Sequence, residues 1–170
     1  VRTNVSIIIE KDRVREVGDG RATIDGAEVI DLSDATVMPG FIDCHTHMTM
    51  ELGRGSSNVF LGMGRRDAEI ALASIPYLRR TLMAGFTAVR DVGAANFLDV
   101  SLRDAVSAGT ITGPRLFVAG RALSITGGHG DFGGIREDLI PEPGYKEGII
   151  NTPEDGVRAV RYLAKYGVDH

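Results

Sequence analysis

The chain has 170 residues, of which 43% are hydrophobic and 25% charged, and its formal net charge is −4. This composition is typical of a water-soluble α/β protein, and nothing in it supplies the basic patch that a nucleic-acid surface needs. The longest apolar runs fall far short of the ~20 residues that span a bilayer, so no membrane segment is expected.

Short β-rich runs open the chain. We predict strands over residues 5–10 (VSIIIE), 13–17 (RVREV) and 27–32 (AEVIDL), with turn chemistry at 18–20 (GDG) between the second and third. Taken alone, these runs fit a generic β-hairpin domain.

The most informative stretch is residues 37–47 (VMPGFIDCHTH), in which an apolar run leaves a Pro-Gly turn and ends in two histidines one residue apart. Alternate side chains of an extended strand share a face, so His45 and His47 should project together. Neutral imidazole is a common ligand of zinc and similar divalent ions, and the pattern therefore predicts a metal-binding pair. The alternative is two polar residues at the exposed end of a strand.

Cys44 is the only cysteine, which rules out an intrachain disulfide and fits a reducing, cytoplasmic compartment. Because it is out of phase with the two histidines, we expect it to be a small buried hydrophobe rather than a nucleophile. The chain begins with Val1 rather than methionine, so a missing leader peptide stays open.

The string PGFIDCHTH resembles the first barrel strand of the amidohydrolase superfamily, whose members are metal-dependent hydrolases built on a (β/α)8 TIM-type barrel. The resemblance implies part of a small N-terminal β-sandwich over residues 1–38 and the first part of such a barrel over 39–170. Since a whole barrel takes ~250 residues, we expect only its first three to four β/α units.

The rest of the chain alternates between helical and strand patterns, as a parallel sheet requires, because parallel neighbours need a crossover. We expect in order a loop over 48–64, a helix over 65–84 ended by Gly85 and kinked or divided by Pro76, a strand over 86–92, a helix over 98–108, a strand over 116–119 and a helix over 155–166. Thr152 is the predicted N-cap of the last helix, with Pro153 in its first turn. Residues 166–170 lead toward a further strand.

His129 lies in the loop after the strand over 116–119, beside five glycines in the eight residues 127–134. Glycines let the backbone approach a ligand closely, but the Lys-Ser/Thr pair of a phosphate loop is absent. The sequence TGGHG resembles a loop of imidazolonepropionase-like proteins and of Xaa-Pro or Xaa-Arg dipeptidases. This resemblance implies that His129 contacts the substrate, and the alternative is a polar turn histidine.

Three further polar residues are candidates for the site. Asp91 ends the strand over 86–92 and would either orient the histidines from behind or form a salt bridge with Arg90 or Arg115. Asp43 would fix a histidine tautomer or cap backbone groups. Arg121 would bind an anionic part of the substrate or remain a solvated surface residue.

The resemblance also implies a cofactor and a reaction. We expect one or two divalent ions, zinc first, with a carboxylated lysine bridging them just beyond residue 170 and a general-base aspartate further on. The expected activity is hydrolysis of amide or peptide bonds by metal-activated hydroxide, with an Xaa-Pro or Xaa-Arg dipeptide as substrate. An imidazolonepropionase-like cyclic amidase, a deaminase and a non-catalytic metal-binding homologue are the alternatives. A homo-oligomer is expected.

Overall fold

The computed structural model describes residues 1–51, 64–131, 133, 136, 138–139 and 141–170. Most of the loop predicted over 48–64, and part of the glycine-rich loop around Gly134, lie outside the described residues. The chain divides into two compact units, Val1–Pro39 and Gly40–His170. No helix in the described ranges has the length and apolar character needed to cross a membrane.

The first unit contains one antiparallel pair of strands, β1 (Val5–Glu10) and β2 (Arg13–Asp19). Both strands were predicted, and β2 runs two residues further than expected, so the turn begins at Gly20, whose φ is +73°. The strand expected over 27–32 is wrong, because these residues form no strand and Ile30 is 73% exposed. A strand needs a hydrogen-bonded neighbour, and in this unit β1 and β2 bond only to each other.

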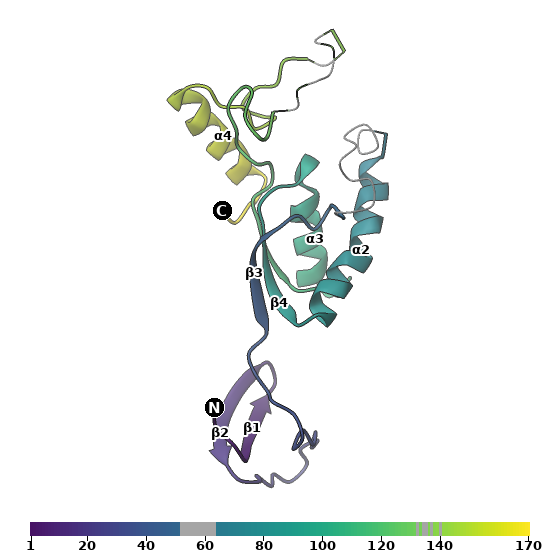
Figure 1. Cartoon of the computed structure of the whole chain (residues 1–170), viewed down its shortest axis with the longest axis vertical. Helices are drawn as coiled ribbons and strands as arrows, with labels where there is room; N and C mark the ends of the chain where they lie inside the picture. The colour runs from purple at the N-terminus through teal and green to yellow at the C-terminus, as the bar shows by residue number, and fades with distance from the viewer. Residues whose placement is uncertain (52–63, 132, 134–135, 137, 140) are drawn as a thin grey trace. The chain divides into compact units, whose positions relative to one another are not determined.

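The second unit is built on a parallel three-stranded sheet of order β3-β4-β5. Its strands are β3 (Phe41–Thr46), β4 (Phe86–Asp91) and β5 (Arg115–Val118), and its helices are α2 (Asp67–Met83), the short η1 (Ala95–Phe97), α3 (Leu98–Ser107) and α4 (Pro153–Lys165). The helices α2 and α3 lie side by side along the sheet (Figure 1). The predicted alternation of strands and helices from Phe41 onward is confirmed.

The ends of these elements follow local sequence signals. Thr152 caps α4, because its hydroxyl accepts a hydrogen bond from the backbone N–H of Asp155 at 3.1 Å. Gly85 ends α2 with φ +96°, in the left-handed region that glycine adopts without steric cost. The helix runs unbroken through Pro76, so of the two expectations, a kink or a division, the division is wrong. Pro76 has no N–H to donate to the helix, and Leu78, two residues further on, is fully buried in the core.

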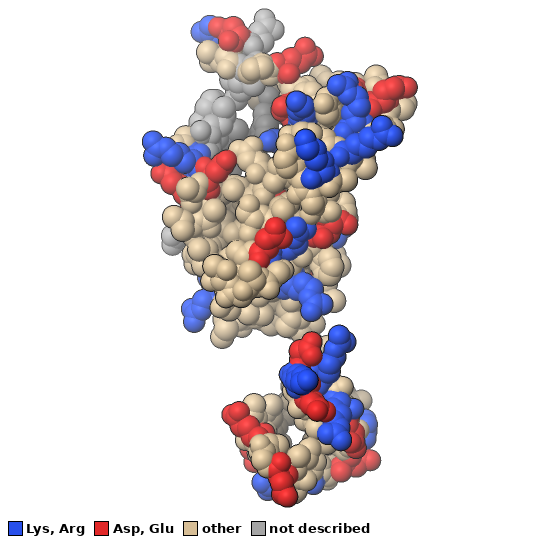
Figure 2. Space-filling model, turned by 180° about the vertical axis from the view of Figure 1, so that it is seen from behind, with Lys and Arg blue, Asp and Glu red and all other residues tan. Residues whose placement is uncertain are grey.

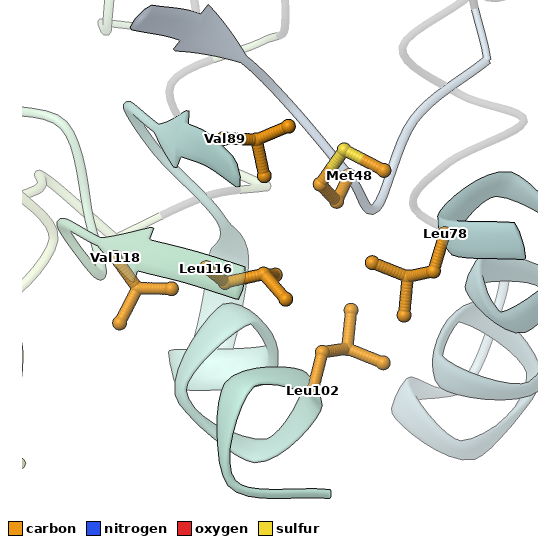
Figure 3. Close-up of a cluster of buried hydrophobic side chains, with 6 residues drawn as sticks. All are labelled: Met48, Leu78, Val89, Leu102, Leu116 and Val118. Atoms are coloured by element: carbon orange, nitrogen blue, oxygen red, sulfur yellow. The ribbon is translucent and has the colours of Figure 1, made fainter. Parts of the chain in front are cut away.

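The core of this unit lies between the sheet and the two helices α2 and α3. Figure 3 shows its six buried side chains, each no more than 5% exposed: Met48, Leu78, Val89, Leu102, Leu116 and Val118. Five of them come from strands or helices, and Met48 comes from the segment directly after β3. The core therefore anchors the chain one residue past His47.

One part of β3 remains uncovered in the described residues. Phe41 and Ile42 are 50% and 66% exposed, and Cys44 is exposed as well, so the expectation of a buried cysteine is wrong. The physical reason is that β3 is an edge strand with a neighbour on one side only. In Figure 2, Lys and Arg side chains gather toward α4, and a small cluster of acidic and basic side chains lies across the middle of this unit.

The last residues run beside β5. The backbone N–H of Asp169 donates to the carbonyl of Val118 at 2.8 Å, and the Asp169 carboxylate accepts from the Val118 N–H at 2.9 Å. Arg103 of α3 holds the same carboxylate at 3.1 Å. This pairing agrees with the predicted approach to a further strand.

Candidate active site

The structure brings His45 and His47 together at the carboxyl end of β3. Their ring centroids are 5.7 Å apart and the rings are inclined at 74°. His45 lies within the strand and is exposed, whereas His47 follows the strand directly and is half-buried. In parallel sheets, ligands bind at the carboxyl ends of the strands, which is where this pair lies.

The ring of His47 is held by the loop after β4. Its Nδ1 lies 2.8 Å from the carbonyl oxygen of Gly93. Because a carbonyl oxygen has no proton to donate, Nδ1 must carry the hydrogen of this bond. In the neutral imidazole, the other ring nitrogen, Nε2, then has a free lone pair, which is the form of histidine that binds a metal ion.

Asp91 ends β4 and is fully buried. Its carboxylate accepts two backbone hydrogen bonds, from Met48 N–H at 2.7 Å and from Gly93 N–H at 3.1 Å. Burial raises the pKa of Asp91, and the nearby Asp99 carboxylate raises it further. The two N–H donors and His47 act in the opposite direction and limit the rise. The carboxylate thus touches the residue after His47 and the residue that binds its ring, but not the ring itself.

The alternative for Asp91, a salt bridge with a neighbouring arginine, is not formed by the described residues. Arg90 instead donates to the carbonyl of Cys44 at 3.4 Å. Asp43 accepts from the backbone N–H of His45 at 3.0 Å. This contact corresponds to backbone capping, the second of the two roles considered for Asp43.

His129 is exposed in the loop that follows β5. Two side chains shape the loop around it: Ser124 accepts from the Gly130 N–H at 3.1 Å, and Asp131 accepts from the Gly127 N–H at 2.7 Å. Because β3 and β5 run parallel in one sheet, this loop begins at the same end of the sheet, the carboxyl end of the strands, as the histidine pair. Substrate contact by His129 stays a prediction.

Arg121 follows β5 and is half-buried. One of its terminal nitrogens lies 3.4 Å from the side-chain oxygen of Asn96, whose amide donates to Asp67 at 3.0 Å. Asn96 and the following Phe97 both adopt left-handed backbone conformations, with φ of 52° and 56°. Asparagine adopts this conformation more readily than most residues, whereas nothing in the sequence indicates it for Phe97.

Two residues behind the histidines were missed by sequence reasoning. Gly93 supplies the carbonyl that fixes the His47 ring. The other residue, Asp99, is a second fully buried carboxylate that has no hydrogen bond to the pair; it accepts from the Gly120 N–H at 2.7 Å and the Val100 N–H at 2.9 Å and so holds the framework rather than the site. Burial raises the pKa of Asp99. The only sequence signal for Gly93 was its place two residues after Asp91, in a strand-to-helix loop.

The donor set of the pair fits a divalent ion of the zinc type, because imidazole nitrogens are among its preferred ligands. Within the described ranges, no three side chains of His, Cys, Asp or Glu come together in a group that could hold a metal ion. The described residues therefore provide two imidazoles and no third ligand.

Solved structures share the fold of this chain. One is a Xaa-Pro dipeptidase with methionine bound in its active site, with a TM-score of 0.87 and 32% identity over 97% of this chain and 40% of that protein. Another is a prolidase in complex with N-methylphosphonate-L-proline, with a TM-score of 0.79 and 38% identity over 95% of this chain and 39% of that protein.

Curated relatives match by sequence. Ochratoxinase of Aspergillus niger is 28% identical over 137 residues, which are 74% of this chain and 27% of that enzyme. Imidazolonepropionase of Fusobacterium nucleatum is 33% identical over 82 residues, which are 46% of this chain and 17% of that enzyme. The chain thus spans well under half the length of each protein that it resembles.

The family is shown by a match to a family model. Residues 36–165, which include β3 with its histidine pair and extend to the end of α4, match the model of the amidohydrolase family. This match covers most of the chain and agrees with the resemblance carried by residues 39–47. The chain belongs to the amidohydrolase family.

Proposed function

We propose that the protein is a metal-dependent hydrolase of amide or peptide bonds whose substrates are Xaa-Pro or Xaa-Arg dipeptides. The observation that carries this proposal is the His45 and His47 pair at the carboxyl end of β3, with Nε2 of His47 left free by the bond to Gly93. Similarity to a Xaa-Pro dipeptidase and to a prolidase supports the substrate class.

In this proposal, His45 and His47 hold a divalent ion, zinc first, which lowers the pKa of water from ~15.7 toward ~7 and polarises a carbonyl. The chain's own residues do the rest: Asp91 and Asp43 hold the backbone around the pair, and His129 contacts the substrate from the loop after β5. Catalytic zinc sites commonly have three protein ligands, so the proposal requires more ligands than the described residues supply.

The proposal also extends to architecture and setting. The sheet β3-β4-β5 with α2 and α3 is taken as the first part of a (β/α)8 barrel, and β1 and β2 as part of a β-sandwich. A bridging carboxylated lysine, a general-base aspartate, a homo-oligomeric state and a cytoplasmic location complete it. The location rests on the single cysteine, and the other elements derive from the resemblance to the amidohydrolase superfamily.

The test begins with metal binding by the full chain. Metal-free protein should bind zinc, and His45→Ala and His47→Ala should each lose that binding, because each removes one of the two imidazole ligands. His170→Ala is the matched control, since His170 is exposed and no contact joins it to the pair in the described structure. Unchanged zinc affinity in both site variants would refute the proposed site.

Turnover is tested on the same zinc-loaded protein with a panel of Xaa-Pro and Xaa-Arg dipeptides. Release of free proline or arginine, lost in His47→Ala, is the expected result. Zinc binding without turnover of any dipeptide or other amide would instead favour the non-catalytic homologue.

A cyclic amidase is the second candidate, favoured by the local match to imidazolonepropionase. A cyclic amidase would open the ring of imidazolone-type amides, and the loss of their ultraviolet absorbance measures this reaction. A dipeptidase would not open these rings. Hydrolysis of the cyclic substrate with no activity on dipeptides would replace the first proposal by this one.

A further inference from the structure

We infer that Asp91 is a positioning residue that fixes the protonation and direction of the His47 ring through the backbone of Gly93 and Met48, without touching the ring. The inference rests on the proposed role of His47 as a metal ligand. It assigns to Asp91 a route of action that differs from direct contact between a carboxylate and an imidazole.

Three hydrogen bonds carry the effect from Asp91 to the ring. One carboxylate oxygen accepts from the N–H of Met48 at 2.7 Å, which ties down the chain one residue past His47. The other oxygen accepts from the N–H of Gly93 at 3.1 Å. The carbonyl of Gly93 then accepts from Nδ1 of His47 at 2.8 Å, so both ends of His47 are fixed relative to β4.

The surroundings leave this arrangement little freedom to shift. Asp91 is fully buried, and the Met48 side chain lies in the core against Leu78. Gly93 approaches the loop after β5 so closely that an added Cβ would lie 3.1 Å from Cβ of Ala122. The Gly93 carbonyl is therefore held at a set distance from the His47 ring by contacts on both sides.

The two histidines differ in this respect. The backbone N–H of His45 donates to Asp43 at 3.0 Å, and its ring lies against the ring of His47, but no hydrogen bond to the His45 ring is present among the described residues. His47 is thus the preorganised ligand of the pair, with Nε2 free before any ion arrives.

Asp99 provides a matched control within the same unit. It is also a fully buried aspartate that accepts two backbone hydrogen bonds, from Gly120 and from Val100. Its hydrogen-bonded link toward the histidine runs through the Gly120 carbonyl to the N–H of Ala94 at 2.6 Å, and it makes no hydrogen bond to Gly93 or His47. Its charge also acts on Asp91, but it holds neither of the two N–H groups that Asp91 holds. Loss of Asp99 should therefore destabilise the fold without freeing the His47 ring.

The experiment compares the full-length wild type with Asp91→Asn and Asp99→Asn. Long-range ¹H–¹⁵N spectra of the metal-free proteins report the tautomer of His47, and competition with a chromophoric chelator reports zinc affinity. In wild type we expect a single tautomer with the proton on Nδ1. An asparagine at 91 offers one acceptor oxygen to two N–H groups, so we expect a mixture of tautomers and roughly 10–100-fold weaker zinc binding.

In Asp99→Asn, the tautomer and the zinc affinity should match those of wild type. Wild-type His47 protonated on Nε2 would overturn the inference, and this measurement does not depend on whether either variant folds. An Asp91→Asn protein with unchanged tautomer and affinity, or an Asp99→Asn protein changed as much as Asp91→Asn, would overturn it as well.

Failure of the proposed function has a different signature. If wild type binds no zinc and hydrolyses no amide, but the tautomer of His47 still changes in Asp91→Asn, the hold of Asp91 on the ring is supported. In that outcome the metal role of His47, and not the positioning by Asp91, is refuted.

Discussion

Replacing Leu78 with alanine should lower the free energy of unfolding by about 3–5 kcal/mol. Leu78 lies on α2, is 0% exposed and packs in the core with Met48, Leu102 and Leu116. The three buried carbons that are lost account for about 2 kcal/mol of this change. The cavity left behind adds about 1–3 kcal/mol, because helix and sheet can close it only in part.

Leu72→Ala is the matched control, since it makes the same chemical change on the same helix at a side chain that is 67% exposed. Its effect should stay within about 0.5 kcal/mol. Urea unfolding of the full chain, followed by far-ultraviolet circular dichroism, measures both variants. With a slope of about 2 kcal/mol per molar urea, the Leu78→Ala midpoint should fall by roughly 2 M.

A difference of less than about 0.25 M between the midpoints of the two variants would refute the reasoning, because it would mean that Leu78 gains no more from burial than Leu72. The same experiment also bears on the site. Leu78 packs against Met48, and the Met48 N–H is one of the two groups held by Asp91.

Three further predictions follow from glycine geometry, from a buried carboxylate and from the loop histidine. Gly120→Ala should lower the free energy of unfolding by about 2–5 kcal/mol, because it combines left-handed backbone strain with a Cβ only 2.8 Å from Val168. Gly109→Ala has the same strain in open space, so it should cost only about 1–2 kcal/mol. Calorimetry compares the two variants, and equal losses of stability would refute the effect of crowding at Gly120. Burial raises the pKa of Asp99 above 3.8, so its stabilising contribution is complete below pH 3.8 and is lost as pH rises through the raised pKa. In urea titrations, the stability advantage of wild type over Asp99→Asn should therefore shrink from acid to neutral pH. An advantage that grows with pH would contradict the raised pKa. His129→Ala should lower kcat/KM for dipeptides by roughly 100-fold with zinc content unchanged, and parallel loss of zinc would refute substrate contact.

The parts of the fold that the sequence predicted are those specified by local chemistry. The apolar spacing and the terminal signals at Gly85 and Thr152 located α2 and α4 to within two residues. The alternation of side chains along a strand was enough to place His45 and His47 side by side. Each of these features depends on residues close together in the chain.

The parts that were wrong or missed depend on distant neighbours. Residues 27–32 have the composition of a strand but no partner strand, and Cys44 has the phase of a core residue on an edge strand that nothing described covers. The role of Gly93 depends on a hydrogen bond across 46 positions in sequence, and that of Asp91 on one across 43. Periodicity within one element cannot specify such contacts.

The separation between framework and loops has a practical consequence for redesign. Because five of the six core side chains belong to strands and helices, we expect that the loop residues around His129 could be varied to test their proposed part in substrate choice, provided that Gly120 and its close packing are kept. The segment after β3 is not interchangeable in this way. The Met48 side chain packs in the core, and its backbone N–H is held by Asp91 beside the histidine pair. Variants at this position should therefore lose stability and also disturb the candidate site.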